Sequence, residues 1–120
     1  MDEKLIPHVI PLEVRLIDAI EVIRENRNRC VIVRAGEKVV GVLSEGDVMR
    51  ALLRGADIHS PIEDWVSRNF KFQPTIDYQQ ALELMRQYGI TIIPILDPNF
   101  ALIDVVSLAD ILGRVELRQS

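Results

Sequence analysis

The sequence predicts a mixed α/β (α+β) protein built from two related repeats, each a small sheet with flanking helices. The first observation behind this prediction is internal similarity: residues 19–24 match the pattern of residues 81–86, which lie 62 positions later. The second is that residues 42–44 with Asp47 match residues 105–107 with Asp110, which lie 63 positions later. Amphipathic helix patterns also alternate with short β-branched runs in both halves. The halves therefore share one plan, with one residue gained between the helix and this strand.

The first half is expected to contain two helices around a hairpin. Apolar residues at helical spacing predict a helix over residues 14–26, which ends in a polar cluster. Residues 30–33 and 39–43 are β-branched runs on either side of Ala35-Gly36-Glu37, a pattern typical of a hairpin. A second helix follows over residues 46–54 and ends at Gly55.

The second half repeats this order after a connecting segment. A helix is expected over residues 77–88, strands over 91–96 and 101–106, and a last helix over 108–117. Ser60 and Pro61 suit the cap and first turn of a short helix between the halves. We therefore expect a first repeat at 1–58, a linker with a short helix at 59–70, and a second repeat at 71–120.

A hairpin with two helices leaves one apolar sheet face uncovered, so neither repeat can bury its core alone. We expect the two pseudo-symmetric copies to pack sheet to sheet and to form two related clefts. Residues 48–53, together with Leu82, Leu84 and Met85, leave additional apolar helix surface. This surplus predicts a homodimer with isologous helix contacts.

Composition excludes several classes of function. The 120 residues carry a net charge of −4, so no overall positive field favours nucleic acid. A single cysteine, Cys30, permits no internal disulfide and is expected to be a buried thiol in a reducing compartment. No signal peptide or membrane-length apolar run is present, which predicts a cytoplasmic protein without membrane contact. His8 and His59 are isolated, so no metal site is expected. The sequence has no clustered general base or activated nucleophile of the kind that would indicate an enzyme. We therefore expect a non-enzymatic protein and assign no catalytic residue.

The informative residues lie where each hairpin meets its following helix. Ser44 and Ser107 end a predicted strand, and Asp47 and Asp110 follow three residues later. One interpretation is a capping box, in which the carboxylate binds the serine amide. The other is a nucleotide site, since helix amides suit a phosphate and a carboxylate can accept both ribose hydroxyls. Gly41 would let a ligand approach the strand closely.

The duplicated pattern of glycine, two apolar residues, serine, two residues and aspartate resembles a tandem pair of CBS domains, over about residues 6–113. The resemblance implies two βαββα-type repeats that bind adenosine nucleotides, dimerise and regulate an attached enzyme or transporter. It implies that Asp47 and Asp110 hold ribose hydroxyls, while Ser44 and Ser107 meet ribose or phosphate. Residues 50–55 and 60–62 further resemble the CBS pairs attached to sugar-phosphate nucleotidyltransferases.

The two motifs are expected to be unequal. The family often has a basic residue opening the first hairpin strand, and Arg29 suits that role, whereas its counterpart at the 63-residue offset is Ile92. Pro94 matches a common family proline, and its counterpart Val31 does not. Gly41 corresponds to Asp104, which would crowd and repel a phosphate, so we expect tighter binding at the first motif. At the helix starts, Gly46 likewise corresponds to the bulkier Ala109.

These patterns predict a non-enzymatic regulatory module whose ligand is an adenine nucleotide, AMP, ADP or ATP. The ligand-binding residues would be Ser44, Asp47, Ser107, Asp110, Arg29 and Gly41. Occupancy would modulate an attached or partner enzyme, such as a nucleotidyltransferase, by a population shift. Two alternatives remain open: a module that only dimerises, with both motifs acting as caps, and a site for S-adenosylmethionine.

Overall fold

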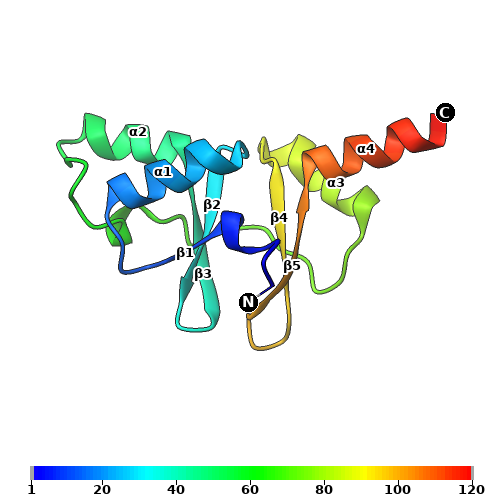
Figure 1. The fold of residues 1–120 in the computed structure, drawn as a ribbon, viewed down its shortest axis with the longest axis horizontal. Helices are drawn as coiled ribbons and strands as arrows, with labels where there is room; N and C mark the ends of the chain where they lie inside the picture. The colour runs from blue at the N-terminus through cyan, green and yellow to red at the C-terminus, as the bar shows by residue number, and fades with distance from the viewer. Residues whose placement is uncertain (1, 120) are drawn as a thin grey trace. The chain divides into compact units, whose positions relative to one another are not determined.

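The structure is a computed structural model that describes residues 2–119, with described side chains for residues 2–114. The chain divides into two compact units, Met1–Phe70 and Lys71–Ser120, so residues 59–70 lie within the first unit. Each unit contains an antiparallel hairpin with two flanking helices (Figure 1). The predicted mixed fold of small sheets and flanking helices is therefore confirmed.

The first unit contains a three-stranded sheet in the order β1-β2-β3, with β1 parallel to β2 and β2 antiparallel to β3. Helix α1 forms the crossover that a parallel pair requires. The elements are η1 (Ile6–His8), β1 (Val9–Pro11), α1 (Leu16–Asn26), β2 (Cys30–Ala35), β3 (Lys38–Ser44), α2 (Glu45–Leu53) and η2 (Glu63–Trp65).

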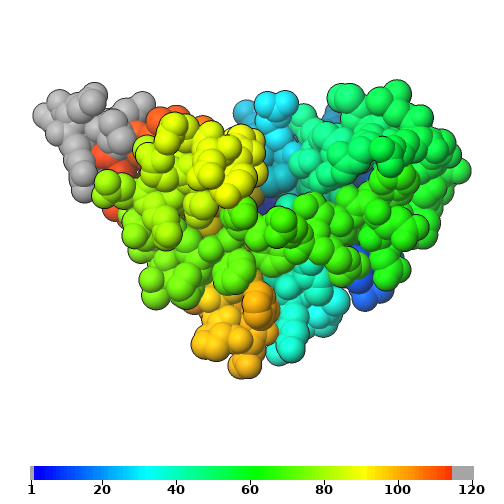
Figure 2. Space-filling view, turned by 180° about the vertical axis from the view of Figure 1, so that it is seen from behind, coloured from blue at the N-terminus to red at the C-terminus, as the bar shows by residue number. Residues whose placement is uncertain are grey.

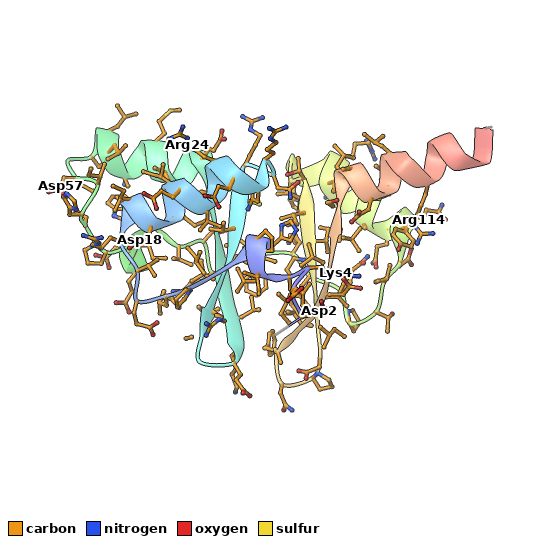
Figure 3. All side chains as sticks on the ribbon, in the orientation of Figure 1. Asp2, Lys4, Asp18, Arg24, Asp57 and Arg114 are labelled. Atoms are coloured by element: carbon orange, nitrogen blue, oxygen red, sulfur yellow. The ribbon has the colours of Figure 1, made fainter. Side chains whose placement is uncertain are left out.

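Helix α1 has an acidic residue near its start and a basic residue near its end. Asp18 lies in its first turn and accepts a hydrogen bond from the Arg15 main-chain N–H at 2.9 Å, while Arg24 lies in its last turn. Figure 3 labels both side chains. A negative charge at the start and a positive charge at the end oppose the helix dipole, which stabilises the helix locally.

The second unit contains α3 (Tyr78–Tyr88), the hairpin β4 (Ile92–Leu96) and β5 (Leu102–Ser107), and α4 (Leu108–Gln119). Asp77 caps α3 by accepting from the Gln80 N–H, and Gly89 ends the helix with φ of 66°. A single parallel bridge between Gln73 and Ile95 occupies the place that β1 has in the first unit. The expected helices and hairpin strands are present within about two residues of their predicted limits.

The sheet register corrects two of the predicted correspondences. Cys30 lies opposite Ser44, and Ile92 lies opposite Ser107, so Ile92 corresponds to Cys30 rather than to Arg29. The counterpart of Arg29 is Thr91, because the two main-chain carbonyls accept from the equivalent helix residues, Glu45 and Leu108, each at 2.9 Å. The extra residue of the second half lies in the hairpin turn, so the 63-residue offset does not apply to the first strand.

The same register moves the counterpart of the proline. Pro94 lies opposite Val105, just as Ile32 lies opposite Val42. Pro94 therefore corresponds to Ile32, and the predicted pairing of Pro94 with Val31 is wrong.

The connection after α2 differs from the predicted capped helix. The short 3₁₀ helix η2 begins after Ile62, which makes no side-chain cap, and the Ser60 hydroxyl instead accepts from the Asp57 N–H at 3.0 Å. The prediction that Ser60 caps this helix is therefore wrong, because the Ser60 hydroxyl closes the preceding turn. The chain then runs beside β3, where the main chains of Ser67 and Val42 exchange hydrogen bonds of 2.9 and 3.0 Å.

Each unit has its own apolar core. In the first unit the cluster joins the inner faces of α1, α2 and the sheet, and in the second it joins α3, α4 and the hairpin. Val48 and Ala51 are buried on α2, whereas Met49 and Leu53 of the same helix are exposed, the latter at 80%. Helix α2 and the segment after it form part of the surface in Figure 2 (green). On α3, Met85 is buried and Leu82 is exposed.

Candidate functional site

The first candidate motif lies where β3 passes into α2. Ser44 has extended backbone and is the N-cap residue, and its hydroxyl accepts from the Asp47 N–H at 3.2 Å. The Asp47 carboxylate reaches back, and its Oδ2 accepts from the Ser44 N–H at 2.9 Å and from the Ser44 hydroxyl at 3.0 Å. This is a complete capping box, as the structural interpretation of the motif predicted.

The other oxygen of Asp47 is also engaged. Its Oδ1 accepts from Arg50 Nη2 at 2.5 Å, across one helical turn. Asp47 is 8% exposed, while half of the Arg50 side chain remains exposed. Charged hydrogen bonds of this kind are about twice as strong as neutral ones, so a ligand at Oδ1 must compete with a guanidinium. The sequence interpretation missed this role of Arg50, although its three-residue spacing from Asp47 is a recognised signal for a helical ion pair.

The second motif has the same frame with fewer bonds. Asp110 Oδ2 accepts from the Ser107 N–H at 3.0 Å, and the Ser107 hydroxyl accepts from the Asp110 N–H at 3.1 Å. Ser107 is buried, whereas Asp110 is exposed. Gly113 stands three residues beyond Asp110, where the first motif has Arg50. Within the part of the chain that the structure describes, Asp110 Oδ1 accepts no hydrogen bond.

Arg29 lies beside the N-terminus of α2 and is largely exposed. Its Nε lies 3.3 Å from Glu45 Oε2, and its main-chain carbonyl accepts from the Glu45 N–H at 2.9 Å. The residue adopts a left-handed backbone conformation with φ of 65°, which is uncommon outside glycine. The structure therefore places a cation next to the first helix start, where it is paired with an exposed carboxylate.

Gly41 has a different role from the predicted one. A Cβ atom at this position would lie 2.5 Å from the Ser67 carbonyl oxygen and closer still to Val66 Cγ1. The close approach to β3 is therefore made by the chain's own segment at Val66 and Ser67. The prediction that Gly41 leaves room for a ligand is corrected accordingly, and the remaining site residues are the serine and aspartate pairs with Arg29.

The other chemically active side chains form no further site in the described residues. Burial raises the pKa of the Cys30 thiol to about 12, so the thiol is a poor nucleophile, as predicted, although the residue is half-buried rather than fully buried. His59 Nδ1 lies 3.2 Å from Arg15 Nη1, and His8 Nδ1 lies 3.3 Å from Asn28 Nδ2.

The described part of the chain offers neither a cluster of metal-binding side chains nor a membrane-length helix. No group of three or more histidine, cysteine, aspartate or glutamate side chains there could hold a metal ion. No helix among the described residues has the length and apolar character that a membrane crossing requires.

Comparison with known proteins gives matches along most of the chain. The CBS domain family matches twice, over residues 1–54 and 62–117. An uncharacterized 17.7 kDa protein of Acidianus ambivalens is 27% identical over 106 residues, which are 87% of this chain and 64% of that protein. The chain therefore spans less than two thirds of the length of this relative.

Solved structures share the fold. A CBS domain protein from Pyrobaculum aerophilum complexed with AMP has a TM-score of 0.74 at 24% identity, covering 95% of this chain and 92% of that one. The cytosolic domain of the Mg²⁺ channel MgtE, in complex with ATP, has a TM-score of 0.70 at 18% identity, covering 89% and 44%. With two family matches and two units of the same plan, the chain belongs to the CBS domain family as a tandem CBS pair.

Proposed function

We propose that this CBS pair is a non-enzymatic sensing module that binds an adenine nucleotide, AMP, ADP or ATP, and modulates an attached or partner enzyme. The observation that carries the proposal is the duplicated motif, which sets a serine at a helix start and a carboxylate in the first turn in both units. CBS pairs are in general regulatory modules, and two structural relatives were solved with AMP and with ATP.

The chemistry of the motif suits a nucleotide. The first amides of α2 and α4 lie at the positive end of a helix dipole, which favours a phosphate. The aspartate accepts hydrogen bonds from ribose hydroxyls, and the serine hydroxyl contributes a further polar contact. Arg29 supplies a cation beside the first helix start. Ribose-binding residues in this proposal are Asp47 and Asp110, with Ser44 and Ser107 at ribose or phosphate.

The hydrogen bonds favour the second motif for ribose, against the order expected from the sequence. Asp47 must release Arg50 before its Oδ1 is fully available, whereas Asp110 is exposed and its Oδ1 accepts nothing in the described part of the chain. The Asp104 carboxylate, which the sequence led us to expect beside a phosphate, has one oxygen that accepts from the Val105 N–H at 2.8 Å. We therefore expect Asp110 to contribute more affinity than Asp47.

A second candidate is a scaffold without a ligand. Its support is the complete capping box at Ser44 and Asp47, which accounts for both residues without a nucleotide. The exposed apolar side chains of α2, Met49, Leu52 and Leu53, would serve such a scaffold as a contact with a second copy.

Calorimetry and thermal-shift titration with AMP, ADP, ATP and S-adenosylmethionine test the proposal. Binding of an adenine nucleotide with a micromolar Kd corresponds to about −8.2 kcal/mol and would raise the melting temperature. Asp110→Ala should weaken that binding, and Asp110→Asn is the matched control, because it keeps an acceptor oxygen without the charge. If the chain binds S-adenosylmethionine and none of the three nucleotides, the ligand in the proposal would be S-adenosylmethionine instead of an adenine nucleotide. No heat and no shift with any of the four would favour the scaffold.

A further inference from the structure

The two hairpins differ in what lies along their outer strands. In the first unit Val42 of β3 directs its main-chain groups away from β2, and both bond to Ser67 at 3.0 and 2.9 Å. The short extended segment at Val66 and Ser67 thus pairs with the edge of β3. Edge strands left without such pairing are templates for association.

The equivalent position in the second unit is Val105 of β5. It lies opposite Pro94 as Val42 lies opposite Ile32, so alternation along an antiparallel pair directs its N–H and C=O away from β4. No strand pairs with this side of Val105 among the described residues. Its N–H instead donates to Asp104 Oδ1, from the neighbouring side chain, at 2.8 Å.

The residue that makes this bond stands where the first unit has Gly41. Asp104 lies opposite Ile95 as Gly41 lies opposite Val33. A Cβ atom at Gly41 would meet the Ser67 carbonyl oxygen at 2.5 Å, so the paired segment tolerates no side chain there. Asp104 has a Cβ atom, and its carboxylate also occupies the N–H that an added strand would use.

We propose that Asp104 guards the β5 edge against pairing with an extended peptide segment. The Cβ atom excludes a segment seated as Val66 and Ser67 are on β3, and the carboxylate both satisfies the Val105 N–H and adds a charge to the edge. Ile103, the bulged neighbour, is 54% exposed and adds apolar surface to this edge, and exposed apolar edges favour association. Removal of the side chain creates a site for a short extended peptide like residues 62–69 of this chain.

Three substitutions in the full chain separate the two effects. Asp104→Asn keeps the Cβ atom and an acceptor oxygen, Asp104→Ala keeps only the Cβ atom, and Asp104→Gly removes both. Peptide binding is measured by fluorescence anisotropy with a labelled peptide of residues 62–69, against a scrambled peptide. Self-association is measured by light scattering over a wide concentration range.

We expect the wild-type chain and the Asn and Ala variants not to bind the peptide, and the Gly variant to bind it. Amide hydrogen exchange at Val105 gives a readout that does not depend on the Gly variant folding: exchange should be about tenfold faster in Asp104→Ala than in Asp104→Asn, because only the former lacks the acceptor. The proposal is overturned if wild type binds the peptide as tightly as the Gly variant, if a folded Gly variant neither binds nor self-associates, or if Val105 exchanges equally in the Ala and Asn variants.

Discussion

Asp47→Ala is expected to destabilise the fold more than Asp110→Ala, while affecting nucleotide binding less. Asp47 accepts from the Ser44 N–H, the Ser44 hydroxyl and Arg50, whereas Asp110 accepts only from the Ser107 N–H within the described residues. Loss of the charged acceptor for the Ser44 N–H and hydroxyl costs roughly 2 to 3 kcal/mol at the nearly buried Asp47, while the Ser44 cap itself remains. The half-exposed Arg50 pair adds about 0.5 kcal/mol. The single bond at the exposed Asp110 is worth about 1 kcal/mol.

Urea denaturation followed by circular dichroism measures the difference, which should be about 1.5 to 2.5 kcal/mol in the free energy of unfolding. Because the chain has two compact units, the Trp65 fluorescence of the first unit is followed as a second probe. Arg50→Ala is the control for the ion pair and should cost well under 1 kcal/mol, since it leaves the bonds between Ser44 and Asp47 in place.

Nucleotide affinity should respond to the two substitutions in the opposite order from stability. Removal of Asp110 should reduce nucleotide affinity by about tenfold or more, as expected for loss of a charged hydrogen bond worth about 1.5 kcal/mol. Equal destabilisation by both substitutions would refute the account of Asp47 as the stronger cap. A larger loss of affinity on removing Asp47 than on removing Asp110 would refute the preference for the second motif and restore the order expected from the sequence.

Three further outcomes follow from the described contacts. Gly41→Ala should cost about 1 to 3 kcal/mol by displacing the segment at Ser67, visible as faster amide exchange at Ser67, and unchanged exchange there would contradict the contact. The pKa of the Cys30 thiol is raised from 9.0 to about 12 in the folded chain, so the unfolded chain loses the thiol proton at lower pH. The free energy of unfolding should therefore fall between about pH 9 and 12. Cys30→Ala should flatten that fall in urea titrations repeated across this pH range. Gln73→Leu should cost about 2 to 3 kcal/mol, because Gln73 is buried and bonds the Asp77 main chain and Gln80; a neutral effect in the same titration would show that these bonds contribute little.

Most of the fold could be predicted because the signals that define it are local. Gly89 ends α3 in a left-handed conformation, and Asp77 caps the same helix, as their positions in the sequence suggest. Strand β1 was not visible in the residue pattern because three residues, Val9–Pro11, are too few to show alternation, and its pairing with β2 depends on the crossover through α1. Ser60 misled because a serine beside a proline serves a turn as readily as a helix cap.

In the candidate site, only the hydrogen bonds between residues close together in the sequence could be predicted. The bonds from Ser44 and Ser107 to the aspartates follow from the three-residue spacing. The role of Gly41 did not, because its neighbours Val66 and Ser67 come from a segment more than twenty residues away in the chain. The counterpart of Arg29 was wrong by one position, because the sequence does not say on which side of the first strand the extra residue lies.

The capping and nucleotide interpretations of the motif are compatible, since a carboxylate has about four positions at which it can accept hydrogen bonds. Asp47 accepts three from the Ser44 N–H, the Ser44 hydroxyl and Arg50, while Asp110 accepts one in the described part of the chain. A ribose diol donates two. Asp110 can therefore cap α4 and hold both hydroxyls together, whereas Asp47 can hold both only by giving up the guanidinium. The same spacing in the sequence thus produces a cap with spare acceptor capacity in one unit and a nearly saturated cap in the other, and the difference comes from the residue three positions later, Arg50 or Gly113.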